Sequence, residues 1–99
     1  MAFYVVLRRT GPDWDPSTPL VEQVAWDEHA AFMDYLVDEG FVVLGGPLED
    51  EARVVLAVEA ASADEVRTTL ARDPWSGTHL VIDTVESWTI RLDGRRREH

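Results

Sequence analysis

The stretch from Trp26 to Asp50, WDEHAAFMDYLVDEGFVVLGGPLED, contains a change of hydrophobic period that decides the fold. In its first half, apolar side chains recur every three or four residues, as on one face of a helix, and acidic side chains occupy the opposite face. Gly40 is the residue type that most often follows a helix, and the apolar run Phe41–Leu44 comes directly after it. The stretch therefore predicts a helix over about Val21–Glu39 that leads into a strand.

The sequence on either side of this stretch predicts three more strands and a second helix. Phe3–Leu7 and Arg53–Ala60 are rich in β-branched residues, and Leu80–Leu92 alternates imperfectly, as one strand or a pair of strands would. A helix is expected over Ser62–Arg72, because a glutamate follows the serine at the spacing of an N-cap pair. The order β-α-β-β-α-β is that of a ferredoxin-like α+β fold, in which two helices cover one face of an antiparallel sheet.

The first and third predicted strands carry apolar residues at consecutive positions, as if both sheet faces were buried. Two helices cover only one face, and a second copy of the chain is the simplest cover for the other. We therefore expect a homodimer. The Pro-rich segment Gly11–Pro19 predicts a long loop, either a lid or a dimer contact.

Length and composition restrict the function classes. With 99 residues we expect a single domain over residues 1–92, followed by a polar tail, residues 93–99, that is expected to be disordered. The net charge of −10 argues against nucleic acid as a partner, and no apolar run is long enough for a membrane span. Apolar residues precede the arginines at the N-terminus, the reverse of a secretory signal, so a cytoplasmic location is expected. The absence of cysteine and lysine excludes thiolate nucleophiles and Schiff bases.

His29 is the first candidate site residue, because it lies on the otherwise apolar face of the first predicted helix. Imidazole ionises near neutral pH, so a histidine in a pocket is able to accept and return a proton. A histidine in this position is also commonly a packed residue that makes one hydrogen bond. Periodicity alone leaves both interpretations open.

Two turn-like motifs supply further candidates. Gly45, Gly46 and Pro47 predict a turn between the second and third strands, or a place where a ligand approaches the backbone closely. Asp73 precedes a proline, which is a common way to end a helix and needs no chemistry. No serine lies in a nucleophile motif, so a serine hydrolase is not supported.

Aromatic and basic residues add three more expectations. Trp75 is the most plausible pocket residue among four tryptophans, which otherwise suit the edges of a small core or an interface. Arg8, at the end of the first strand, is a candidate for binding an anionic substrate, although an exposed strand end also favours arginine. His29, His79 and Asp73 lack the spacing of a metal site, and no metal is expected.

The stretch Trp26–Asp50, together with the RDPW and VESWTI segments, resembles the YCII-related family of small dimeric α+β barrel proteins. The resemblance implies that His29 and Asp73 lie together as a catalytic His-Asp pair, and that the Gly-Pro motif lies at a ligand pocket. At the His79 position the family tends to have a small residue, so a narrower pocket is expected here.

The leading functional hypothesis is an enzyme of the lyase or isomerase type that needs no cofactor and acts on a small molecule, with an aromatic compound as one candidate. His29 would be the general acid and base, Asp73 would orient it, and Gly46 would lie near the ligand. The alternative is a non-catalytic module that binds a small molecule or modulates a partner enzyme. A cofactor-free oxygenase is a third possibility.

Overall fold

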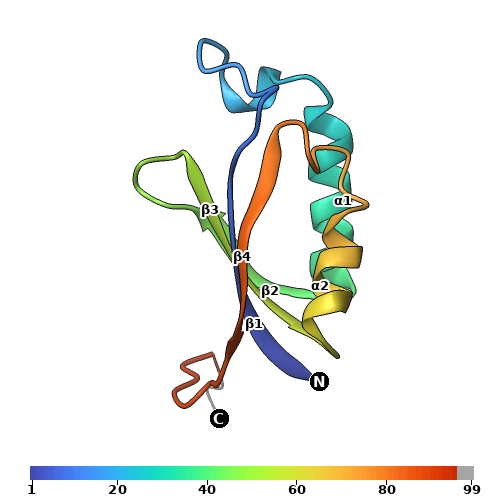
Figure 1. The fold of residues 1–99 in the computed structure, drawn as a ribbon, viewed down its shortest axis with the longest axis vertical. Helices are drawn as coiled ribbons and strands as arrows, with labels where there is room; N and C mark the ends of the chain where they lie inside the picture. Colours follow the sequence, from blue (N-terminus) through green and yellow to red (C-terminus); the bar gives the residue numbers. More distant parts are fainter. Residues whose placement is uncertain (96–99) are drawn as a thin grey trace.

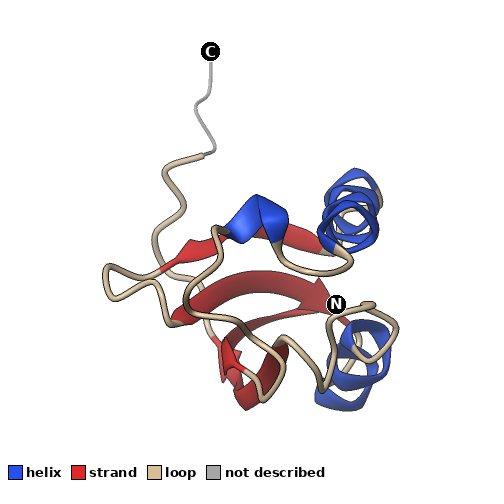
Figure 2. Ribbon diagram, turned by 90° about the horizontal axis from the view of Figure 1, so that it is seen from above, coloured by secondary structure: helices blue, strands red, loops and turns tan. Residues whose placement is uncertain are grey.

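Four strands form one antiparallel sheet in the order β2-β3-β1-β4. The structure is a computed structural model and describes residues 1–95. Two helices, α1 and α2, lie together on one side of the sheet (Figures 1 and 2). The elements in chain order are β1 (Ala2–Thr10), the 3-10 helix η1 (Leu20–Glu22), α1 (Trp26–Asp38), β2 (Val42–Pro47), β3 (Arg53–Ala60), α2 (Ala63–Leu70) and β4 (Leu80–Trp88). This is the predicted ferredoxin-like β-α-β-β-α-β arrangement.

Helix α1 begins later than its hydrophobic period predicts. Ala25 adopts a left-handed conformation with φ of 64°, which separates the short helix η1 from α1, so the helix begins at Trp26. Its C-terminal end agrees with the prediction, because Gly40 has φ of 83°. The amides of Gly40 and Phe41 donate to the carbonyls of Val37 and Leu36, which completes a Schellman motif.

Helix α2 is capped by the serine that the sequence indicates. The Ser62 hydroxyl accepts a hydrogen bond from the Glu65 amide at 3.1 Å. The Glu65 carboxylate accepts from the amide of Ala61 at 2.6 Å, one residue before the expected N-cap amide. The helix ends at Leu70, two residues before the predicted end.

The expected turn at Gly45-Gly46-Pro47 was wrong, because these three residues belong to β2 and pair with Leu56, Val55 and Val54 of β3. The strand lies at the edge of the sheet, where proline is tolerated because no neighbour needs its missing amide hydrogen. The hairpin turn follows in residues 48–52. The last strand is also shorter than expected, since β4 is a single strand that ends at Trp88.

The apolar core lies between the helices and one face of the sheet. Its buried members are Val6, Leu36, Val42, Leu56, Val58, Ala60, Val66 and Leu70. On the other face, alternate residues of β1 and β3, including Val5, Leu7, Val55 and Ala57, have no helix over them and are buried or half-buried. No helix within residues 1–95 is long and apolar enough to cross a membrane. The predicted tail lies largely outside the described residues, from residue 96 onward, and so does His99.

Candidate active site between α1 and the sheet

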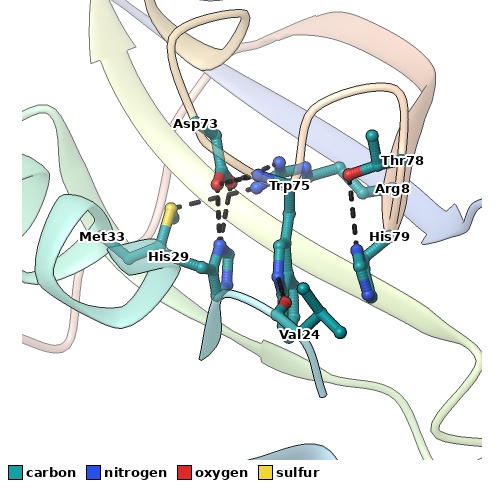
Figure 3. A network of polar contacts seen from close by, with 8 residues as sticks. All are labelled: Arg8, Val24, His29, Met33, Asp73, Trp75, Thr78 and His79. Atoms are coloured by element: carbon teal, nitrogen blue, oxygen red, sulfur yellow. Dashed lines mark hydrogen bonds and ion pairs between the residues drawn. The ribbon is translucent and has the colours of Figure 1, made fainter. Parts of the chain in front are cut away.

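Three charged or titratable side chains from distant parts of the chain meet beneath the helices (Figure 3). His29 comes from α1, Arg8 from β1, and Asp73 from the turn after α2. The Nδ1 atom of His29 lies 2.8 Å from Oδ1 and 3.0 Å from Oδ2 of Asp73. The Nη2 atom of Arg8 donates to Oδ2 of Asp73 at 2.6 Å. The fold thus brings together two residues that are 44 positions apart and that no spacing rule connects.

The Asp73 carboxylate is the hub of this network. Its side chain is fully buried, and it also accepts a hydrogen bond from the amide of Trp75 at 2.9 Å. Burial by itself raises the pKa of the Asp73 carboxyl, but the hydrogen bonds from His29, the Trp75 amide and Arg8 outweigh it and hold the pKa below its usual value. Asp73 is therefore an ionised acceptor at neutral pH.

The ionised carboxylate decides which nitrogen of His29 carries a proton. Because a carboxylate only accepts hydrogen bonds, Nδ1 of His29 must donate to Asp73. In the neutral imidazole this leaves the lone pair on Nε2, which has no hydrogen-bond partner within residues 1–95. The side chain keeps 11% of its surface exposed and lines the cavity described below. In this arrangement Nε2 is the nitrogen that is able to accept a proton.

Trp75 packs against one face of the His29 imidazole. The two rings stack with centroids 4.1 Å apart and an interplanar angle of 8°. The indole Nε1 of Trp75 donates to the carbonyl oxygen of Val24 at 2.7 Å, which fixes the position of the ring. His79 stacks on the opposite face of Trp75, with centroids 4.9 Å apart (Figure 3). Trp75 therefore separates the two histidines, and both are held parallel to it.

A cavity of about 480 Å³ opens beside this network. Its walls are largely apolar and aromatic, and it is large enough for a small organic ligand. Its lining residues come from all four strands, from α1, from the segment before α1, from the β2–β3 turn and from the turn after α2. They are Arg8, Thr10, Trp14, Pro16, Thr18, Pro19, Leu20, Trp26, His29, Met33, Pro47, Glu51, Ala52, Val54, Leu56, Trp75 and Leu80. The imidazole of His29 and the guanidinium of Arg8, both bound to Asp73, thus line one cavity together with aromatic rings.

A second, more open groove of about 400 Å³ runs between α1 and β2. Gly45 and Gly46 line this groove, whereas Pro47 lines the main cavity. His29 and Met33 line both hollows, so they form part of the wall between them. The glycines predicted to approach a ligand therefore lie in the neighbouring groove and not around the same space as Trp75.

The structure rules out one of the two interpretations of Arg8 and corrects the expectation about His79. Arg8 does not lie at an exposed strand end, since it is only 2% exposed, and it is the next residue, Arg9, that extends to the surface and pairs with Asp83 at 2.7 Å. Side chains alternate between the two sheet faces along β1, so Arg8 shares the buried face of Val6 and Arg9 lies on the opposite face. His79 does not narrow the cavity, because it lies behind Trp75 and is not among the lining residues.

The loop before α1 and the first residue of α1 supply two cavity tryptophans that the sequence did not single out. Trp14 meets Trp75 edge-on with centroids 5.8 Å apart, and Trp26 lies 5.7 Å from it. The loop keeps its shape through Gln23, whose buried amide group bonds to the backbone of Asp15 and donates to the carbonyl of Thr18. The loop thus forms a wall of the cavity. The signals for it in the sequence were the Pro-rich segment, for which a lid was one expectation, and the unusual number of tryptophans.

The structure gives little support for a metal centre. Within residues 1–95, no group of three or more histidine, cysteine, aspartate or glutamate side chains is arranged to hold a metal ion. Of the three conceivable ligands, His29 binds Asp73 directly, and Trp75 lies between His29 and His79.

Comparisons with known proteins support the fold but do not identify the family. Neither a family model nor a curated protein matches the chain. Among solved structures, the chain is similar to the 5-chloro-2-hydroxyhydroquinone dehydrochlorinase TftG from Burkholderia phenoliruptrix AC1100, determined in complex with 2,5-dihydroxybenzoquinone. The likeness has a TM-score of 0.54 and 21% sequence identity, and it covers 96% of this chain and 99% of the other. The two proteins share a fold, while membership of the YCII-related family stays a prediction.

Proposed function

We propose that this protein is an enzyme of the lyase or isomerase type that transfers a proton on a small planar molecule, without a cofactor. The observation that carries the proposal is the contact between His29 and Asp73, which directs the free Nε2 lone pair away from the carboxylate and beside a ring-lined cavity. The pair is placed as an orienting carboxylate and a general base are placed in hydrolytic triads.

In the proposed reaction, Nε2 of His29 removes a proton from the bound molecule. The electron pair of the broken bond stays on the ligand, where a conjugated ring spreads the charge. An isomerase would return the proton from Nε2 to another atom of the ligand, whereas a lyase would let the electron pair expel a leaving group. Asp73 stabilises the imidazolium in either case, because the Nδ1 hydrogen bond strengthens when the ring becomes charged.

The structural neighbour supports the choice of compounds to test. By its description, that protein is a dehydrochlorinase, which removes hydrogen chloride from a chlorinated hydroxyhydroquinone. Planar hydroxylated rings also suit a cavity whose walls include Trp14, Trp26 and Trp75. Hydroxylated and chlorinated hydroquinones are therefore the first substrates to examine.

The alternative function is a non-catalytic module that binds the same class of molecule. It is favoured by the aromatic walls, which suffice to hold a planar ligand whether or not His29 takes part in a reaction. The two functions differ in one respect, namely whether a bound molecule is converted to product.

The test compares His29→Gln with His79→Gln, because both histidines stack on Trp75 but only His29 lines the cavity. We expect His29→Gln to lower kcat by about 10²- to 10⁴-fold with little change in ligand affinity, since general acid-base catalysis contributes about that much. His79→Gln should keep most of the activity. Turnover is followed by ultraviolet absorbance and chloride release, and binding by calorimetry. Unchanged turnover in His29→Gln contradicts the proposed role, and binding without any product favours the binding module.

We also propose that the functional unit is a homodimer. The sheet face without helices carries Val5, Leu7, Val55 and Ala57, a set that water would solvate poorly. A solution mass equal to one chain would contradict this proposal.

A further inference from the structure

Arg8 has hydrogen-bond donors that the protein does not use. Its Nη2 donates to Asp73, whereas its Nη1 donates to the sulfur of Met33 at 3.9 Å, and a thioether is a weak acceptor. The Nε atom is buried without a partner. In residues 1–95 only one other buried side-chain polar atom, the Thr84 hydroxyl, shares that condition. An unsatisfied donor on a buried cation is costly. Because the Arg8 side chain also lines the cavity, an acceptor on a bound ligand would satisfy part of the guanidinium.

The charges around the cavity define what that acceptor is. Arg8 and Asp73 form a buried pair whose charges cancel. If His29 is also protonated, as it is after it removes a proton from a ligand, the network has two cations and one carboxylate. Asp73 itself does not line the cavity, and the carboxylate that does, Glu51, is exposed and lies in the β2–β3 turn. With His29 protonated, one negative charge on the ligand would neutralise the network. A second negative charge on the ligand would have no cation left to pair with and would lie in the same cavity as Glu51.

The walls define the shape of the same ligand. Trp75, Trp26 and Trp14 line the cavity with ring systems, which favour a flat, delocalised molecule over an aliphatic acid. Arg8 is part of the same lining. A guanidinium is also the side chain best suited to a planar anion, because its donors form a rigid fork.

We propose that the cavity binds a planar ring that carries one ionised oxygen, an enolate or a phenolate, and that Arg8 is the residue that receives this oxygen. The inference rests on the proposed function, since it names the substrate class of the same cavity, and it assigns Arg8 a binding role separate from its pairing with Asp73. The charge that forms on the ligand when His29 removes a proton would then lie next to a fixed cation.

The test uses two probes that differ in one ionisable group. 4-Nitrophenol ionises near neutral pH, and 4-nitroanisole has a methyl group in place of the acidic hydrogen. We expect the native protein to bind the phenolate about 10- to 100-fold more tightly than the anisole, which is the range of a charged hydrogen bond. The absorption band of nitrophenolate should also persist in the bound probe at a pH where the free probe is protonated.

The dependence of phenolate affinity on salt concentration is a second readout. It distinguishes a buried contact with Arg8 from long-range attraction to surface charges. The chain as a whole has a formal charge of −10 and repels anions at long range. Added salt screens that repulsion more than it weakens a buried contact, so phenolate affinity should rise or stay level with ionic strength. A fall in affinity with salt would indicate an exposed cation at the surface and would count against Arg8.

Variants assign the effect to one side chain. Arg8→Gln should abolish the preference for phenolate, and Arg8→Lys should keep part of it. Arg9→Gln is the matched control, because Arg9 is the neighbouring arginine and pairs with Asp83 on the exposed side. If Arg8→Gln does not fold, since it leaves Asp73 without its cation, the Arg8→Lys variant and the absorption band in the native protein still decide the question.

The outcomes separate this inference from the proposed function. Equal affinity for the two probes, binding of neither, or an undiminished preference in Arg8→Lys and Arg8→Gln would overturn the role of Arg8. Those results would leave the kcat comparison of His29→Gln and His79→Gln intact. Conversely, a clear phenolate preference with no effect of His29→Gln on turnover would support the anion site and contradict proton transfer by His29.

Discussion

Val6 and Arg8 lie two residues apart on the same face of β1, and both are buried, but they belong to two different regions. Around Val6 the space between sheet and helices is filled with aliphatic side chains. Around Arg8 the same layer contains an ion pair, a histidine, stacked rings and a cavity. The chain thus concentrates its packing at one end and keeps polar groups and empty space at the other.

The two regions respond differently to the loss of a side chain. In the apolar region, removing a large side chain loses transfer free energy and leaves a void, at a cost of about 2–5 kcal/mol for a leucine. In the polar region, a buried ion pair contributes little net stability while it is complete, but removal of one partner leaves an uncompensated charge. Single substitutions therefore cost about as much in the polar region as in the apolar one, but for a different reason, because the complete ion pair itself adds little net stability.

Asp73→Ala should lower the free energy of unfolding strongly. The substitution leaves Arg8 buried without its anion and removes the acceptor of His29 and of the Trp75 amide. We expect a loss of about 3–5 kcal/mol, measured by urea denaturation at neutral pH. Leu36→Ala in the apolar region is the control, with a loss of similar size.

The two variants should differ in what they do to the site. Leu36 does not line the cavity, so Leu36→Ala should keep ligand affinity in the folded fraction. Asp73→Ala should lose it, because the orientation of both Arg8 and His29 depends on the carboxylate. A stability loss below about 1 kcal/mol for Asp73→Ala would mean that the network is solvated and that the contrast between the regions is wrong.

The dependence of stability on pH sharpens the contrast. Because the folded-state pKa of Asp73 lies below its unfolded value, the carboxyl contributes stability above that unfolded value, and the contribution disappears as pH falls through the folded-state pKa. Native protein should therefore lose stability below about pH 4, and Asp73→Asn should make this acid limb shallower.

Asp50→Asn is the matched control for the acid limb. The pKa of the Asp50 carboxyl is also lowered, chiefly by the amide of Ala52, but its carboxylate is exposed to solvent and pairs with Arg53 at the surface. Its substitution should change the acid limb much less. If the two variants gave the same curve, the buried network would not be the source of the acid sensitivity.

The sequence predicted the elements better than it predicted the depth of particular side chains. Periodicity and Gly40 located α1, because a helix face repeats with a fixed spacing. The neighbouring sequence does not show which of Arg8 and Arg9 is buried, however. The alternation of side chains along β1 and its pairing in the sheet bury Arg8 and expose Arg9. The same limit applies to Gly45 and Gly46, since turns and edge strands both accept glycine.

The site itself was only partly within reach of the sequence. His29 stood out as a polar residue on an apolar stripe, but its pairing with Asp73 came from a resemblance and not from any spacing. Trp14 gave no sign of lining a cavity, because a loop conformation held by Gln23 decides where it lies. Contacts between segments far apart in the chain leave no local pattern.

Alanine substitutions of Gly45 and Gly46 should have the smallest effects. They test whether a change in the packing of the apolar region alters ligand binding in the polar region. A Cβ on Gly45 would lie 2.6 Å from Cδ2 of Leu56, a side chain that belongs to the apolar core and also lines both hollows. A Cβ on Gly46 would meet nothing within 4 Å. We expect Gly45→Ala to cost about 1 kcal/mol, at the low end for overpacking because the end of a leucine is able to move.

Gly46→Ala should leave stability unchanged or raise it slightly, since alanine restricts the unfolded chain more than glycine does. Thermal unfolding measures both variants, and titration with the ring probes measures the site. If the displaced leucine side chain shifts toward the cavity, Gly45→Ala should weaken binding while Gly46→Ala leaves it unchanged. Equal affinities in both variants would show that the packed region absorbs the added methyl group by itself, and a loss confined to Gly46→Ala would instead favour close approach of the ligand to the β2 backbone.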